Sequence, residues 1–297
     1  MAALNLWSGA RQDLLVPFGI SASSVFGVRI DGATHFLRLT SRSFRGVDDV
    51  ANELSFLQHL WSHGVRVAMP VPSIHGQNAE RVGDYLATVF RRAPGLLLTP
   101  ESRLWNRAFF QEWGRTLAFQ HEAARTFCCP SSAWRRDWRR EPMLVEGLKL
   151  IRANDEQLTH HVDAILAELE LQDDAFGEVG MIHADLGPQN FRYDPDIGIT
   201  AFDFDNCCRH WFLYDIAVSL SVLRLRSERE RLIQWIFEGY RSLRPLPGDR
   251  SSLRVLLRLR LLYVYCDRLC SFGVAPRPDQ TNILRGVRDR LILGEVW

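Results

Sequence analysis

The chain has 297 residues and a formal net charge of +1, and 46% of its residues are hydrophobic and 24% charged. This length allows two lobes with a core each, and the composition is ordinary for a soluble globular protein. The near-zero net charge gives no support for nucleic-acid binding, and no apolar run reaches the length of a membrane span. Because no secretory signal follows Met1 and the six cysteines lack the pattern of a disulfide framework, we expect a cytoplasmic protein with reduced thiols.

The first part of the chain predicts strands and one helix. Residues 25–30 alternate and are rich in β-branched side chains, Asp31-Gly32 is a hairpin turn signal, and residues 34–40 return as a second strand. Residues 47–64 carry apolar side chains at three- and four-residue spacing and end in glycine, which predicts a helix. Residues 85–90 form another apolar strand. This order is typical of a kinase small lobe.

The later part of the chain predicts helices and short buried strands. An apolar helical stripe runs through residues 109–117, and a more polar helix covers residues 158–171. Two short apolar segments, residues 181–182 and residues 199–202, come directly before polar residues. This pattern places polar side chains on loops at the ends of buried strands.

Three of those polar residues have the spacing of a phosphoryl-transfer site. Asp185 is followed by Asn190 five positions on, and Asp203 comes thirteen residues after Asn190. One carboxylate can position a substrate hydroxyl and accept its proton, while an amide oxygen and a second carboxylate can hold the Mg²⁺ that neutralises charge on the phosphates of ATP. The pattern therefore indicates a kinase.

The segment from His183 to Asn190, with Asp203 downstream, resembles the catalytic loop of the aminoglycoside phosphotransferase and choline-kinase-like (APH) family. That loop usually runs His-Gly-Asp-Leu-x-x-x-Asn, and this chain has Ala184 in place of the glycine, a one-methyl change that we regard as minor. The resemblance implies a protein-kinase-like, two-lobed α+β fold. A small β-rich lobe over residues 1–91 would bind the nucleotide, and a larger, mainly helical lobe over residues 92–297 would carry catalysis and substrate binding.

The resemblance also implies roles for the residues of the loop. Asp185 is the expected catalytic base, and Asn190 and Asp203 are the expected Mg²⁺ ligands. His183 is of the residue type that most often acts as a general base, but its position in the family favours bracing the catalytic loop. Asp215 is expected to accept backbone N–H groups of that loop, with capping of a helix as the alternative.

The family's phosphate-binding lysine has no counterpart, because Lys149 is the only lysine in the chain. Arg38 falls at the lysine's position, and Glu53 falls where a helix glutamate would aim it, so we expect this pair to hold the nucleotide phosphates. The alternatives are an exposed strand position for Arg38 and a solvated helix face for Glu53. The turn at residues 19–24 is expected to cradle phosphate, although an ordinary loop fits its sequence as well.

The acceptor is expected to be the hydroxyl of a small molecule such as an amino alcohol, sugar or antibiotic, with no nucleic-acid or membrane partner. Between residues 226 and 268 arginines outnumber acids, which speaks against polycationic aminoglycosides. Glu238-Gly-Tyr-Arg241 resembles a segment of homologous small-molecule kinases but identifies no substrate. Two alternatives stay open: a bacterial Ser/Thr protein kinase of the same fold, and a nucleotide-binding regulator with impaired catalysis.

Overall fold

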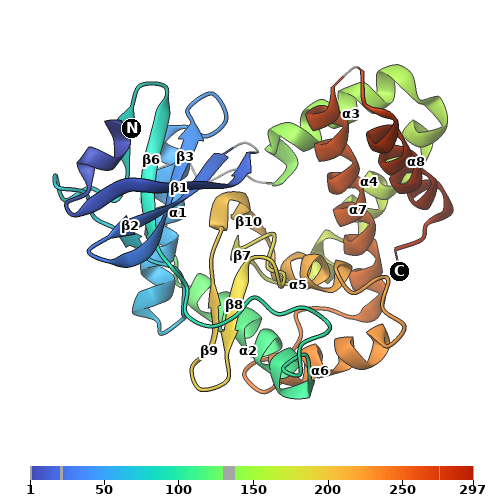
Figure 1. Ribbon diagram of the computed structural model, residues 1–297. Coiled ribbons are helices and arrows are strands. Elements are labelled where there is room, and N and C mark those ends of the chain that lie inside the picture. Colours follow the sequence, from blue (N-terminus) through green and yellow to red (C-terminus); the bar gives the residue numbers. More distant parts are fainter. Residues whose placement is uncertain (1, 21–22, 130–137, 274, 297) are drawn as a thin grey trace. The chain divides into compact units, whose positions relative to one another are not determined.

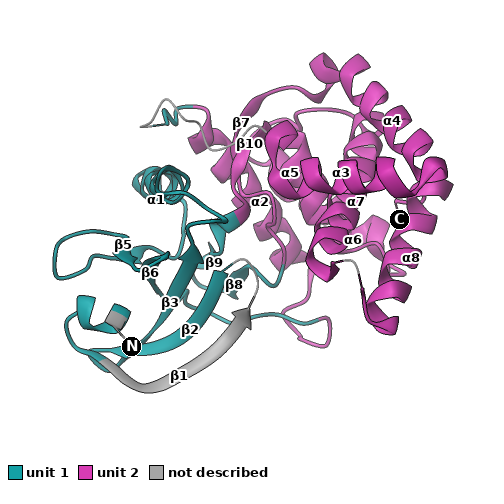
Figure 2. Cartoon of the chain, turned by 90° about the horizontal axis from the view of Figure 1, so that it is seen from above, with its two compact units in different colours: residues 1–99, 126–135, 188–205 teal, residues 100–125, 136–187, 206–297 magenta. Residues whose placement is uncertain are grey.

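The chain forms two compact units. The computed structural model describes residues 2–20, 23–129, 138–273 and 275–296, with the backbone alone for residue 2 and residues 11–20. Unit 1 comprises Met1–Thr99, Thr126–Arg135 and Pro188–Asp205, and unit 2 comprises Pro100–Arg125, Arg136–Gly187 and Asn206–Trp297 (Figure 2). Each unit is therefore assembled from segments that are distant in sequence. A division into lobes at residues 91 and 92 stays a prediction.

Unit 1 is built on an antiparallel sheet in which the strand order is β1-β2-β3-β6-β4 and β5 pairs with β6 (Figure 1). Its strands are β1 (Ala10–Ile20), β2 (Ser23–Ile30), β3 (Ala33–Ser41), β4 (Pro70–Val71), β5 (Glu80–Val82) and β6 (Tyr85–Arg91). The turn from β2 to β3 has φ of 48° at Asp31 and 79° at Gly32. Two consecutive left-handed residues suit the twist of a two-residue hairpin, so the predicted hairpin is confirmed.

The alternation of side chains along β3 gives the sheet its two faces. Leu37 packs into a hydrophobic core that also contains Trp7, which follows the short 3-10 helix η1 (Ala2–Leu6). Arg38 must point to the opposite face, because successive side chains of a strand alternate. There it meets Glu53 of helix α1 (Val47–Ser62). The local sequence patterns did not predict η1 or β1.

A second hairpin in unit 1 carries polar residues of the predicted site. It consists of β8 (Phe191–Asp194) and β9 (Gly198–Ala201), and isolated bridges join Ala201 to Val67 and Tyr193 to Leu96. The second bridge requires glycine at position 95. A Cβ atom there would lie 2.5 Å from the Tyr193 carbonyl oxygen, and φ is 89°. Such close backbone contact fixes β8 against the segment that follows β6.

Unit 2 is mainly helical, with one short antiparallel pair formed by β7 (Val179–Ile182) and β10 (Cys208–Trp211). Short 3-10 helices cover Trp138–Arg140 (η2) and Asp173–Phe176 (η3), and η4 (Phe204–Asn206) follows β9. Its α-helices within the described residues are α2 (Arg107–Ala124), α3 (Pro142–Asn154), α4 (Glu156–Leu171), α5 (Phe212–Ser221), α6 (Arg229–Arg241), α7 (Arg250–Phe272) and α8 (Pro278–Leu293). The helices predicted at residues 109–117 and 158–171 are confirmed as parts of α2 and α4.

Helices α2 and α6 approach each other closely at two glycines. A Cβ atom on Gly114 would lie 1.9 Å from the Ile236 carbonyl oxygen, and one on Gly239 would lie 1.9 Å from the Gln111 carbonyl oxygen. Glycine at both positions thus sets the spacing of the helix pair. None of the helices in the described ranges is long and apolar enough to cross a bilayer. The six cysteines are free thiols, as expected.

Candidate active site

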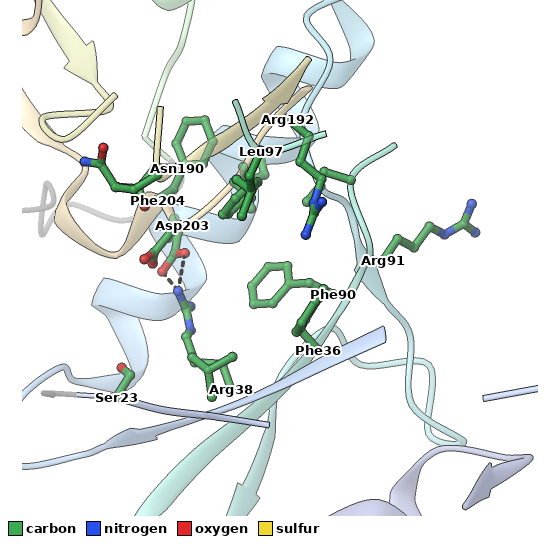
Figure 3. A pocket seen from close by; sticks show the side chains of 17 residues that line it. Ser23, Phe36, Arg38, Phe90, Arg91, Leu97, Asn190, Arg192, Asp203 and Phe204 are labelled. Carbon is green, nitrogen blue, oxygen red and sulfur yellow. Dashed lines mark hydrogen bonds and ion pairs between the residues drawn. The ribbon is translucent and has the colours of Figure 1, made fainter. Parts of the chain in front are cut away.

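A cavity of about 350 Å³ lies within unit 1. This volume is in the range of small-molecule and cofactor sites. Figure 3 shows its side chains: Phe36, Arg38 and Phe90 come from the sheet, and Asn190 and Asp203 come from the β8–β9 region. Four of the six residues predicted for the site, Arg38, Glu53, Asn190 and Asp203, line this one cavity although they are far apart in the sequence.

Arg38 and Glu53 form a bidentate ion pair. The Arg38 Nη1 and Nη2 atoms donate to Glu53 Oε1 and Oε2, each at 2.8 Å, and both side chains are buried. Burial alone would lower the pKa of Arg38, but the charge of Glu53, helped by Asp205 and Asp203, raises it above its usual value. The Arg38 guanidinium also lies 4.9 Å from the centre of the Phe90 ring. The predicted pair therefore exists as a fixed cation in the cavity, and its role stays a prediction.

Asn190 and Asp203 sit at the base of the β8–β9 hairpin. The Phe202 N–H donates to the Asn190 carbonyl oxygen at 2.9 Å, which joins the two segments just where the polar side chains begin. Asp203 has φ of 63°, a left-handed conformation that is uncommon outside glycine. Such conformations persist only where the surrounding structure fixes them, and they cluster at functional sites.

The donors in this cavity fit a hard divalent cation. An amide oxygen from Asn190 and a carboxylate from Asp203 are oxygen ligands of the kind that Mg²⁺ prefers. No group of three His, Cys, Asp or Glu side chains able to hold a metal occurs in the ranges that the structure describes. A cation held here would thus complete its coordination with phosphate oxygens and water, the usual arrangement for Mg²⁺ at a nucleotide.

The first part of the loop that is predicted to be catalytic belongs to unit 2, where Asp215 of α5 braces it. The His183 and Ala184 N–H groups donate to the Asp215 carboxylate at 3.2 and 2.8 Å. His121 Nε2 lies 3.3 Å from the same carboxylate, and His121 Nδ1 lies 2.9 Å from the Tyr240 hydroxyl. Burial would raise the pKa of Asp215, but hydrogen bonding and the charge of His121 hold it below its usual value. The predicted bracing by Asp215 is confirmed.

His183 and Ala184 shape the backbone just before Asp185. His183 is fully buried, and its Nδ1 atom accepts the Asp185 N–H at 3.3 Å, a geometry that suits bracing. Ala184 has φ of 62°. A left-handed residue other than glycine costs roughly 1–2 kcal/mol, so the extra methyl group carries a strain that we did not anticipate from the sequence.

Asp185 is paired with an arginine that the sequence did not single out. Arg260 of α7 donates from Nη2 to Asp185 Oδ1 at 2.7 Å, and both side chains are mostly buried. Arg260 belongs to the arginine-rich region between residues 226 and 268, and it is a fixed part of the loop's surroundings. Arg260 and Asp185 are 75 residues apart in the sequence, so no local sequence pattern indicates that they are paired.

A second, smaller cavity of about 30 Å³ lies within unit 2 near that pair. Aromatic side chains make up much of its lining, and His210 is stacked between Trp138 and Tyr214, with ring centres 5.1 and 3.9 Å away. Arg260 also contributes to the lining. The space is large enough for about two water molecules, because one needs roughly 10–15 Å³.

One expectation for the cavity in unit 1 is not tested, and one of its lining residues was not expected. Residues 21 and 22 of the turn predicted to cradle phosphate lie outside the described residues, so that prediction is not tested. Ser23, at the end of the turn, lines the cavity, and its hydroxyl lies 3.1 Å from the Thr40 hydroxyl. Arg192 also lines the cavity, and the sequence analysis missed it because it belongs to no motif.

Comparison with known proteins places these observations in a family. A model of the phosphotransferase enzyme family (APH) matches residues 15–246. Amicoumacin kinase of Bacillus subtilis (strain 168) is 31% identical over 196 residues, which are 64% of this chain and 57% of that protein. Homoserine kinase of Caulobacter sp. (strain K31) is 28% identical over 240 residues, which are 77% of this chain and 72% of that protein.

Solved structures share the fold. A complex of an amicoumacin kinase with AMP-PNP, Ca²⁺ and Ami has a TM-score of 0.86 and 23% identity, and the match covers 99% of this chain and 92% of the other. A microcompartment-associated aminopropanol kinase has a TM-score of 0.77 and 23% identity, with coverage of 99% and 95%. The predicted kinase-like α+β fold is confirmed by these likenesses.

Proposed function

This chain belongs to the phosphotransferase enzyme family, and we propose that it transfers the γ-phosphoryl group of ATP to a hydroxyl group of a small molecule. The observation that carries the proposal is the cavity of about 350 Å³ that brings the Arg38–Glu53 pair together with Asn190 and Asp203. A fixed guanidinium and two hard oxygen donors are what a nucleotide triphosphate with its metal requires.

In this proposal each residue has one role. Glu53 aims Arg38 at the nucleotide phosphates, and Asn190 and Asp203 hold Mg²⁺, which when bound offsets charge on the phosphate oxygens. Asp185 orients the acceptor hydroxyl and takes its proton while the bond from the γ-phosphorus to the bridging oxygen breaks and a bond to the acceptor oxygen forms. His183 and Asp215 brace the loop that carries Asp185.

An amino alcohol is the acceptor class that we favour. Two relatives are named for homoserine and aminopropanol, both of which carry a hydroxyl and an amino group. The match to the amicoumacin kinase of Bacillus subtilis spans 57% of that protein's length, and its acceptor is not carried over.

The test is a screen for phosphorylated products. Purified protein with Mg²⁺ and ATP is offered amino alcohols, hydroxy amino acids, sugars and hydroxyl-bearing antibiotics, and mass spectrometry seeks products heavier by one phosphoryl group. Transfer should occur to at least one amino alcohol and should require Mg²⁺. ATP binding without transfer to any acceptor would instead support the nucleotide-binding regulator.

Asp185→Asn is the variant that ties transfer to the proposed base. The amide keeps the size of the carboxylate but cannot take a proton, so turnover should fall by roughly two to four orders of magnitude. ATP affinity, measured by calorimetry, should stay within a few-fold of wild type because the proposed role concerns the acceptor. Near-normal turnover in this variant would remove Asp185 from the proposal.

A further inference from the structure

Arg192 is a half-buried cation for which the structure shows no carboxylate partner among the described residues. It lies on β8 and lines the cavity of unit 1, and its Nη1 atom donates to the Gly95 carbonyl oxygen at 3.4 Å. Burial lowers the pKa of Arg192, and the neighbouring charge of Arg92 lowers it further. The protein thus keeps a guanidinium in a partly desolvated, like-charged position, which costs free energy.

Three other shielded arginines of the chain are paired with carboxylates. Arg38 is bound to Glu53, Arg258 to Glu168 and Arg260 to Asp185. Arg192 differs from these three because it lines the cavity without a carboxylate partner among the described residues. A ligand in the cavity can therefore supply the partner that the described part of the chain does not.

The position of Arg192 shows which end of a nucleotide it would meet. Only Phe191 separates it from Asn190, and the side chains of both Asn190 and Arg192 line the cavity. Two positions along an extended chain span roughly 7 Å, at about 3.3 Å per residue. Figure 3 shows Asn190, Asp203 and Arg38 on one side of the cavity and Arg192 on the other, above Phe90. Arg192 is also held beside Gly95, in the segment that follows β6, and not near Ser23.

Several apolar side chains line the same cavity as Arg192. Phe36 and Phe90 line the cavity from the sheet, and Leu97 lines it from the segment beyond Gly95. Phosphate oxygens would gain nothing from such surroundings, whereas a flat heterocyclic ring fits between apolar side chains and a planar guanidinium. Arginine is well suited to this contact because its delocalised cation stacks on aromatic faces.

We propose that Arg192 binds the nucleobase by stacking its guanidinium on the ring, while Arg38 holds the phosphates. This inference rests on the proposed function, since it assumes that a nucleotide occupies the cavity. Contact with the nucleobase is thereby assigned to a residue that belongs to no recognised motif. The two arginines of the cavity then contact different parts of the nucleotide.

The experiment separates the base from the phosphates by using three ligands. Binding of adenosine, ATP with Mg²⁺, and inorganic tripolyphosphate with Mg²⁺ is measured by calorimetry for wild type, Arg192→Leu, Arg192→Lys and Arg92→Leu. Arg92 is the matched control, because it is exposed, its charge acts on Arg192, and its side chain does not line the cavity. It reports the effect of removing one nearby positive charge without removing the stack.

Arg192→Leu should weaken adenosine and ATP by the same factor, about 3- to 30-fold, the range for a partly desolvated cation over a ring. Tripolyphosphate affinity should stay within twofold of wild type, which also shows that the variant is folded. Arg192→Lys should recover only part of the loss, since an ammonium lacks the planar face. Arg92→Leu should change each affinity less than twofold.

Two results would overturn the inference. If Arg192→Leu weakens tripolyphosphate and ATP but leaves adenosine unchanged, the guanidinium contacts phosphate. If all three affinities are unchanged, Arg192 does not contact the nucleotide. Failure of the proposed function looks different. Wild-type protein would then either bind neither ATP nor tripolyphosphate, or bind ATP without transferring its phosphoryl group to any acceptor, and the second result would leave the role of Arg192 in base binding intact.

Discussion

Asp203 combines a charge and a backbone conformation that one substitution can separate. Its φ of 63° is left-handed, and asparagine is among the few residue types that tolerate this region. Asp203→Asn therefore keeps the backbone and the side-chain size while it removes the negative charge. The variant is a test of the charge alone.

Asp203→Asn should lose most Mg²⁺-dependent turnover, because a neutral amide offsets the charge of a metal–phosphate complex poorly. Titration of Mg²⁺ at saturating ATP should show a metal requirement raised by an order of magnitude or more. Circular dichroism should match wild type. A normal Mg²⁺ titration would show that Asp203 does not hold the metal.

An ion pair joins β3 to α1. Arg38 comes from a strand and Glu53 from a helix, and both are buried, so removal of one partner leaves the other charge without compensation. Arg38→Ala should lower the ATP affinity more than Glu53→Gln does, because Arg38 makes the proposed phosphate contact. The double variant should lose less ATP-binding free energy than the sum of the two single losses, since the pair acts as one unit.

Calorimetric ATP affinities for the four proteins of this cycle provide the measurement. Arg38→Lys is the control, since it keeps the positive charge but loses the two-point contact with Glu53. Strictly additive losses would contradict a shared role for the pair in nucleotide binding.

The contact between α2 and α6 explains the segment Glu238-Gly-Tyr-Arg241 in structural terms. Glu238 accepts from Arg107 and Gln111 of α2, at 2.8 and 3.0 Å. Gly239 allows the close helix approach, and Tyr240 is bound to His121. The segment that resembles other small-molecule kinases thus holds a helix pair together and supports the network around Asp215.

Gly239→Ala should destabilise the fold by more than about 2 kcal/mol, because a methyl group 1.9 Å from the Gln111 carbonyl oxygen forces the helices apart. Urea unfolding gives the measurement. Gly286→Ala is the matched control, since it lies in α8 and a Cβ there meets nothing within 4 Å. That control should be neutral or slightly stabilising. Equal effects of the two substitutions would show that the helix contact is not what demands glycine.

Across the whole chain, local sequence patterns predicted the elements whose formation depends on residues close together in the sequence. The hairpin through Asp31 and Gly32 and the helix containing Glu53 follow from turn chemistry and periodicity, and both are present. The Arg38–Glu53 pair could be predicted because a family resemblance aligned two separate elements. Arg260 beside Asp185 and Arg192 in the cavity could not, because their significance comes only from tertiary contacts with no recurring spacing.

The stability of the chain should depend on pH through His210. This ring is buried between Trp138 and Tyr214, and burial, aided by the charge of Arg139, lowers its pKa well below the usual value. The folded state therefore keeps His210 neutral, whereas the unfolded chain binds a proton below about pH 6.5. Unfolding then takes up a proton, so the free energy of unfolding should be constant above pH 6.5 and should fall as the pH drops below it.

The expected slope is up to about 1.4 kcal/mol per pH unit for this one group, between pH 6.5 and 5.5. Urea unfolding followed by tryptophan fluorescence suits the measurement, since Trp138 and Trp211 lie beside His210. His210→Gln should reduce the slope even if it also lowers stability, and part should remain because burial lowers the pKa of His121 too. His160→Gln, at an exposed position of α4, should leave the slope as in wild type. If the slope in His210→Gln is the same as in wild type, His210 does not take up the proton on unfolding, and another group does.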